Sequence, residues 1–208
     1  IRTQSLRRQG LGELTRQLNN VIEQLTSAEL YATMACLRFV SGSSEVEWAV
    51  AGHHHIVHYR GASGEVHRLG GPSFPVGLLP ERDYETSVTR VETGDLLAIY
   101  TDGLNETTNS SDQELGHDAI EREIARLADG PLGEMQAPVF ALARNHGPQV
   151  DDMTLLLVRT RQPGSVLTKP PEGRKAAIGG SEARIGRSER PCCHHSCATS
   201  CGRSCRWI

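Results

Sequence analysis

Three aspartates stand beside apolar segments that the sequence predicts to be buried strands. Asp102 follows the run 96–100, and Asp151 and Asp152 precede the run 153–158. A carboxylate next to a buried strand is costly to desolvate unless it is paired, hydrogen-bonded or bound to a metal. If the two strands are antiparallel neighbours, Asp102 and Asp151 lie at the same edge of a sheet and converge on one cation. Such an all-oxygen ligand set favours Mg²⁺ or Mn²⁺ over Zn²⁺.

The same aspartates also have a purely structural explanation. The dipeptide Asp102-Gly103 is of a type common in turns, and an aspartate before a strand is often a solvated cap. Residue types and spacing alone leave both interpretations open.

Two groups of histidines and cysteines invite a transition-metal interpretation. The first is the histidine group at 53–55 and 58, but alternation along a strand points its members to opposite faces, so we expect no shared ion. The second is the segment 192–205, which holds five cysteines and two histidines. It lacks paired C-x₂-C spacing and an apolar scaffold, so unselected coding sequence is the favoured interpretation and a zinc site the alternative.

The elements that must position these residues follow from hydrophobic periodicity. Apolar residues at spacings of three and four predict a helix over 11–25 whose apolar face packs on a sheet. Further helices are predicted over 117–129 and 134–145, the latter beginning near Pro138. Apolar runs and alternation predict strands at 31–40, 46–50, 56–60, 65–69, 88–91, 95–100 and 153–158. The early strands are expected to form an antiparallel meander.

Charge and cysteine content divide the 208-residue chain into two parts. Residues 1–160 hold 13 basic and 22 acidic side chains and one cysteine, Cys36. This composition argues against a nucleic-acid binder and against a disulfide-stabilised secreted domain. Residues 161–208 hold 9 basic and 3 acidic side chains and no periodicity, so we expect a disordered tail. No apolar run approaches the roughly 20 residues that span a bilayer.

Several segments in order resemble the metal-dependent protein phosphatases of the type 2C superfamily, in the bacterial branch of the stage II sporulation protein E phosphatase domain. The resemblance covers roughly residues 6–160, and its specificity comes from the order and spacing of the motifs. The motifs are Ala51-Gly52-His53, the loop 71–77, Gly94-Asp95-Leu96-Leu97 running into Thr101-Asp102-Gly103 with Glu106, and Asp151-Asp152-Met153-Thr154.

The resemblance implies an α+β fold, an αββα layered sandwich of two antiparallel sheets flanked by helices. It also implies two Mn²⁺ or Mg²⁺ ions that activate water for hydrolysis of a phosphoserine or phosphothreonine. Asp102 and Asp151 would be catalytic metal ligands, and Asp152 would occupy a neighbouring ligand position. The residues that orient or pack around these ligands would be Thr101, Gly103, Thr154 and His53, with the other histidines of the group exposed.

The family pattern also includes an earlier acidic loop whose aspartate bridges both metals. Residues 1–10 contain no carboxylate, so we expect an N-terminally incomplete phosphatase domain over 1–160, followed by the tail 161–208. The leading hypothesis is a cytoplasmic phosphatase for a phosphorylated regulatory protein, such as an anti-anti-sigma factor, with an upstream sensor domain or a dimer as further expectations. A catalytically inactive, phosphatase-like binding module is the alternative. A third hypothesis is a zinc-dependent nucleic-acid binder acting through the basic tail.

Overall fold

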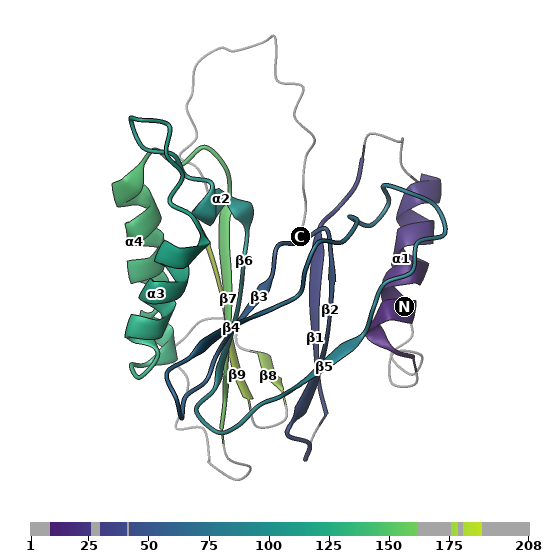
Figure 1. The fold of residues 1–208 in the computed structure, drawn as a ribbon, viewed down its shortest axis with the longest axis horizontal. Coiled ribbons are helices and arrows are strands. Elements are labelled where there is room, and N and C mark those ends of the chain that lie inside the picture. The colour runs from purple at the N-terminus through teal and green to yellow at the C-terminus, as the bar shows by residue number, and fades with distance from the viewer. Residues whose placement is uncertain (1–8, 26–29, 41, 162–175, 179–180, 189–208) are drawn as a thin grey trace. The chain divides into compact units, whose positions relative to one another are not determined.

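The computed structural model describes residues 9–25, 30–40, 42–161, 176–178 and 181–188. The described residues fall into two compact units (Figure 1). The first contains the described residues up to His55 together with Gly70–Arg90, and the second contains Ile56–Leu69 and the described residues from Val91 onward. No helix in these described ranges is long and apolar enough to cross a membrane.

The first unit is a three-stranded sheet with one helix. Its strands are β1 (Met34–Phe39), β2 (Glu45–Ala51) and β5 (Ser87–Arg90), in the order β1-β2-β5, with both pairs antiparallel. Helix α1 (Leu11–Leu25) contacts the central strand β2. Its bounds match the helix that the apolar spacing predicts.

The buried face of α1 overlaps only in part with the predicted apolar stripe. Leu11, Thr15 and Asn19 are buried, whereas Val21 and Leu25, at the end of the apolar stripe, are 51% and 79% exposed. The reason is that Asn19 binds a loop: its amide donates to the Leu79 carbonyl at 2.9 Å, and its Oδ1 accepts from the Gly77 N–H at 2.8 Å. Polar contacts with the segment after β4 therefore account for the burial of Asn19 beside the apolar stripe of α1.

The second unit is built on a six-stranded antiparallel sheet in the order β4-β3-β6-β7-β9-β8. The bounds are β3 (Ile56–Tyr59), β4 (Val66–Leu69), β6 (Leu96–Tyr100), β7 (Met153–Thr160), β8 (Ala176–Ile178) and β9 (Ser181–Ser188). Helices α3 (His117–Leu127) and α4 (Gln136–His146) lie side by side along this sheet (Figure 1). Two short helical turns complete the unit, α2 (Asp102–Asn105) and the 3₁₀ turn η1 (Leu132–Glu134).

An aliphatic core joins these helices to the sheet. Ile120 and Ile124 of α3 and Val139 of α4 are fully buried in one cluster with Leu155 and Leu157 of β7. Burial of such side chains stabilises the fold by about 1.5–3 kcal/mol each. Two antiparallel sheets, one with helix α1 and the other with helices α3 and α4, confirm the predicted α+β class.

The predicted continuous meander is wrong at one point. Strands β2 and β3 belong to different sheets, because the chain leaves the first sheet at Gly52. Gly52 has φ +67°, and a Cβ on it would lie 2.5 Å from the Pro75 side chain. Its N–H donates to the Ser73 hydroxyl at 3.0 Å. The close approach of loop 70–75 thus fixes the corner where the sheets separate.

Two short parts of the segment 161–208, which was expected to be a disordered tail, form strands. Within it, 176–178 and 181–188 form β8 and β9, and β9 pairs along the whole length of β7. Alternation of Ala183 and Ile185 with Glu182 and Arg184 is the strand pattern that the sequence analysis overlooked. The cysteine- and histidine-rich segment 192–205 lies outside the described residues.

Candidate metal centre

The register of β6 and β7 places the predicted aspartates at one edge of the sheet. The two strands are antiparallel neighbours, and Tyr100 pairs with Leu155. Asp102 begins α2 just after β6, and Asp151 and Asp152 immediately precede β7. The geometric premise of the sequence analysis, antiparallel adjacency of these two strands, is therefore correct.

Hydrogen bonds from backbone and hydroxyl groups join the two segments at this edge of the sheet. The Thr101 N–H donates to the Thr154 carbonyl at 3.1 Å, and the Thr154 N–H donates to the Thr101 hydroxyl at 2.8 Å. The same hydroxyl donates to the Asp152 carbonyl at 3.1 Å. Thr101 thus ties the backbone that carries Asp102 to the backbone that carries Asp152.

Gly103 permits the close approach of the two segments. A Cβ on Gly103 would lie 2.5 Å from the Asp152 carbonyl oxygen and 3.3 Å from the Asp151 carbonyl carbon. Any side chain at this position would force the start of α2 away from the Asp151-Asp152 segment. Asp102-Gly103 is therefore more than a turn signal, because the glycine is required for packing between the elements that carry the aspartates.

The carboxylates offer an open, oxygen-only ligand set. Asp151 is exposed, and its Oδ1 accepts from the Asp152 N–H at 2.7 Å, while Asp102 and Asp152 are half-buried. Among the residues that the structure describes, no group of three or more histidine, cysteine or acidic side chains is gathered so as to hold a metal ion. Mg²⁺ is commonly held by one or two carboxylates, with waters and substrate phosphates completing its shell. The residues at this edge fit that pattern.

Sequence comparison identifies the family. The profile described as "Stage II sporulation protein E (SpoIIE)" matches residues 1–161. The chain belongs to this family. This confirms the resemblance on which the expected fold and site residues depend.

Among curated proteins, the chain is similar to the phosphoserine phosphatase RsbU of Bacillus subtilis. The two are 24% identical over 151 residues, which cover 72% of this chain and 45% of RsbU. The chain therefore spans less than half the length of RsbU.

Solved structures share the fold. The phosphatase domain of SpoIIE from B. subtilis, presoaked with Mn, matches with a TM-score of 0.52 and 20% identity, covering 73% of this chain and 65% of that one. The RsbU and RsbW domains of a Mycobacterium tuberculosis protein match with a TM-score of 0.64 and 21% identity, covering 77% and 44%. A serine/threonine phosphatase of S. agalactiae matches with a TM-score of 0.52 and 18% identity, covering 75% of this chain and 72% of that one.

The histidines are distributed differently from the expectation. His53 belongs to the first unit, where its half-buried ring stacks on that of His54 with 4.2 Å between centroids. His55 and His58, expected to be exposed, are only 8% and 2% exposed. The expected exposure fails for His58 because its ring has a buried partner, Asp95.

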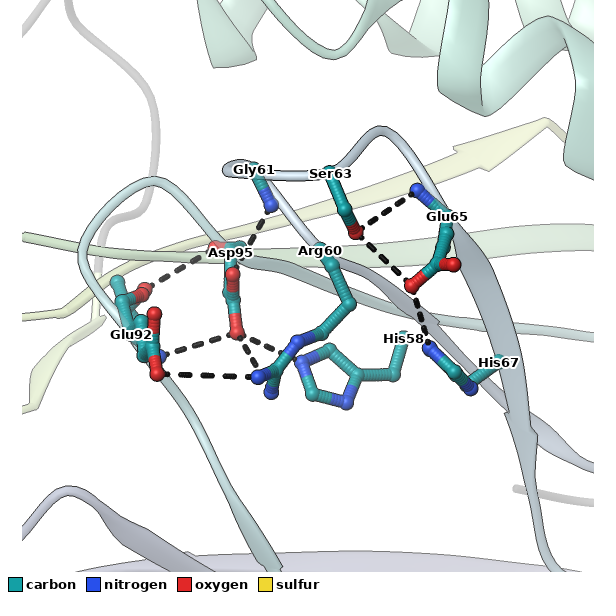
Figure 2. Close-up of polar contacts among 9 residues, drawn as sticks. His58, Arg60, Gly61, Ser63, Glu65, His67, Glu92 and Asp95 are labelled. Carbon is teal, nitrogen blue, oxygen red and sulfur yellow. Dashed lines mark hydrogen bonds and ion pairs between the residues drawn. The ribbon is translucent and has the colours of Figure 1, made fainter.

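Asp95 is a buried carboxylate of the SpoIIE-family segment 94–97 to which the sequence analysis assigned no role. It is 1% exposed and precedes β6, at the end opposite Asp102. Its Oδ2 lies 2.9 Å from His58 Nε2 and accepts from the Glu92 N–H at 3.0 Å, and its Oδ1 accepts from the Gly61 N–H at 2.9 Å (Figure 2). The Arg60 guanidinium lies 3.4 Å from Oδ2.

These contacts determine the charge state of Asp95. Burial alone would raise the pKa of this carboxyl, but the hydrogen bonds from Glu92, His58 and Gly61 outweigh it and hold the pKa below its usual range. The sequence pattern that marks Asp151, an acidic residue directly before a buried strand, also marks Asp95 and could have revealed its cluster of contacts.

Replacing Thr101 with valine should destabilise the edge that carries the aspartates. The substitution keeps the shape of the side chain but leaves the Asp152 carbonyl and the Thr154 N–H without this partner. We expect a loss of about 1–3 kcal/mol in the free energy of unfolding, measured by urea denaturation. Thr101→Ser, which keeps the hydroxyl, should retain most of that stability. Equal losses in the two variants would show that the hydroxyl has no such role.

Proposed function

We propose that this chain carries a metal-dependent protein phosphatase domain that hydrolyses phosphoserine or phosphothreonine on a regulatory protein. The observation that carries the proposal is the placement of Asp102 and of the Asp151-Asp152 pair at the same end of two adjacent antiparallel strands. Membership of the SpoIIE family and similarity to a phosphoserine phosphatase support it.

In the proposed mechanism, Asp102 and Asp151 would hold Mn²⁺ or Mg²⁺, and Asp152 would provide a neighbouring oxygen. A bound ion would supply positive charge for the phosphoryl oxygens and a water of lowered pKa, so no covalent phospho-enzyme is needed. The Thr101 bridge keeps the two carboxylate-bearing segments in register. The exposure of Asp151 leaves this edge open to a phosphorylated side chain on another protein.

The proposed substrate is a phosphorylated regulator of transcription, such as an anti-anti-sigma factor, in the cytoplasm. Two of the matches support this class, because one is named phosphoserine phosphatase RsbU and the other contains RsbU and RsbW domains. An upstream sensor domain or a dimer would then provide the regulation.

The test is hydrolysis of p-nitrophenyl phosphate and of a phosphoserine peptide by the full chain, with Mn²⁺, with Mg²⁺ and with EDTA. We expect turnover that requires the divalent ion, is abolished by EDTA and is restored by excess Mn²⁺. Hydrolysis that is insensitive to EDTA would contradict the proposal.

One observation favours a second candidate, a phosphatase-like module that binds a phosphoprotein without hydrolysing it. The described residues supply only a partial ligand set, with no group of three or more metal-binding side chains. This candidate predicts no turnover with either ion, but retention of a phosphoserine peptide in preference to its unphosphorylated form.

A further inference from the structure

The C-terminal hairpin of β8 and β9 covers one edge of β7. In the sheet order β7 lies between β6 and β9, and all eight of its residues pair with β9, beginning with Met153 opposite Ser188. The SpoIIE profile ends at residue 161, so the hairpin lies beyond the part of the chain that the family match covers. The strand that directly follows Asp151 and Asp152 therefore has a neighbour that is not included in the family match.

The surroundings of β7 show why this edge needs a partner. Met153, Leu155 and Leu157 are fully buried, and the other residues of the strand are buried or half-buried. An unpaired strand edge presents a row of N–H and carbonyl groups, which cost free energy where buried side chains keep water away. Pairing with β9 provides partners for these groups.

Hydrogen bonds on the opposite edge show which backbone groups of β7 face β9. Thr154 bonds to Thr101 through both its N–H and its carbonyl, so its backbone groups point toward β6. Because these directions alternate along a strand, the backbone groups of Met153, Leu155 and Leu157 point toward β9. The first residue of β7 is thus held by β9, and the second is held by Thr101.

We infer that β9 is a positioning strand for the proposed metal site. Its pairing with β7 holds the Asp151-Asp152 segment where it can share an ion with Asp102, and the last pair, Met153 with Ser188, lies one residue from Asp152. Because it concerns that ion, the inference rests on the proposed function. The backbone of β9 provides the effect. Without it, the start of β7 would be held by hydrogen bonds on the β6 edge alone.

Arg184→Pro in the full chain tests the pairing. Arg184 is opposite Leu157, so its N–H faces β7, and proline removes that donor. We expect the Mn²⁺ affinity, measured by electron paramagnetic resonance titration of the free ion, to fall by about 10-fold, as when a group that orients a ligand is lost. Amide hydrogen exchange, measured by NMR, gives a second readout. The N–H groups of Leu155 and Leu157 should exchange faster, whereas that of Leu156, which faces β6, should not.

Ser188→Pro is a milder variant in case Arg184→Pro does not fold. Ser188 is the last residue of β9, and its N–H also faces β7, opposite Met153. The substitution removes only this last pair, so we expect a smaller loss of Mn²⁺ affinity in the same direction. An unchanged affinity in Ser188→Pro and in Arg184→Pro would overturn the inference.

Arg187→Pro is the matched control, since it also replaces one arginine with proline. Arg187 is opposite Thr154, so its N–H points away from β7. Arg187→Pro, and Arg184→Ala, which keeps the N–H, should bind Mn²⁺ as the unsubstituted chain does. A loss in either control equal to that in Arg184→Pro would overturn the inference. Failure of the unsubstituted chain to bind Mn²⁺ would overturn the proposed metal site and this inference together.

Discussion

Asp102→Asn should lower Mn²⁺-dependent hydrolysis of p-nitrophenyl phosphate by at least about 100-fold. The amide keeps the size of the side chain but removes the negative charge that a divalent cation requires. Changes to residues that only support a ligand cost about 10- to 100-fold, and loss of a ligand itself should cost at least as much. Because Asp102 is half-buried at the start of a short helix, the substitution should leave the melting temperature close to that of the unsubstituted chain.

A matched control separates ligand loss from a general change in charge. Asp129→Asn alters an exposed aspartate of the same unit, just beyond α3, and should leave both hydrolysis and Mn²⁺ affinity unchanged. Titration of free Mn²⁺ by electron paramagnetic resonance gives a readout that needs no turnover, and Asp102→Asn should bind the ion more weakly than Asp129→Asn. If Asp102→Asn retains the affinity and the activity of the control, Asp102 is not a metal ligand.

The location of the candidate site could be predicted because strand ends are visible in the sequence. An apolar run that stops at Thr101-Asp102-Gly103 and another that begins after Asp151-Asp152 show where carboxylates meet buried strands. Antiparallel pairing of those runs is the single additional assumption, and the register of Tyr100 with Leu155 bears it out. The sequence does not reveal what individual atoms do. The hydrogen bonds of the Thr101 hydroxyl with the backbone of Asp152 and Thr154, for example, become visible only in the structure.

The parts that could not be predicted depend on contacts between distant segments. Hydrophobic periodicity located α1 but misjudged its buried face, because Asn19 is buried by hydrogen bonds to residues some 60 positions away. The separation of β2 from β3 depends on loop 70–75 approaching Gly52. The family resemblance implied that His58 is exposed, but a partner 37 positions away makes its burial favourable. Local sequence patterns locate helices and strands, whereas polar contacts between distant segments influence which face of each element is buried.

Asp95→Asn should lower the free energy of unfolding by about 3–5 kcal/mol at pH 7. The aspartate is 1% exposed, and its carboxylate accepts from His58 and from two backbone N–H groups. Asparagine offers one acceptor oxygen in place of two and places an amide donor where only acceptors fit. The neighbouring Arg60 then also loses its buried counter-charge.

The same cluster predicts how stability depends on pH. Because the folded-state pKa of Asp95 lies below its usual range, ionised Asp95 stabilises the fold fully above the unfolded-state pKa of about 3.9. This contribution is lost as the pH falls through the lower, folded-state pKa. Urea unfolding should therefore show a constant difference between the unsubstituted chain and Asp95→Asn from pH 7 to 5, and a shrinking difference below about pH 4.

Glu92→Gln is the control within the same cluster. Glu92 lies 3.8 Å from Arg60 but has a side chain 51% exposed, so its loss should cost no more than about 1 kcal/mol. The two substitutions each remove one negative charge beside Arg60 and differ in burial and in the number of hydrogen bonds (Figure 2). A similar loss of stability in both variants, or a difference for Asp95→Asn that persists undiminished at pH 3, would show that burial of the Asp95 charge is not what stabilises this end of β6.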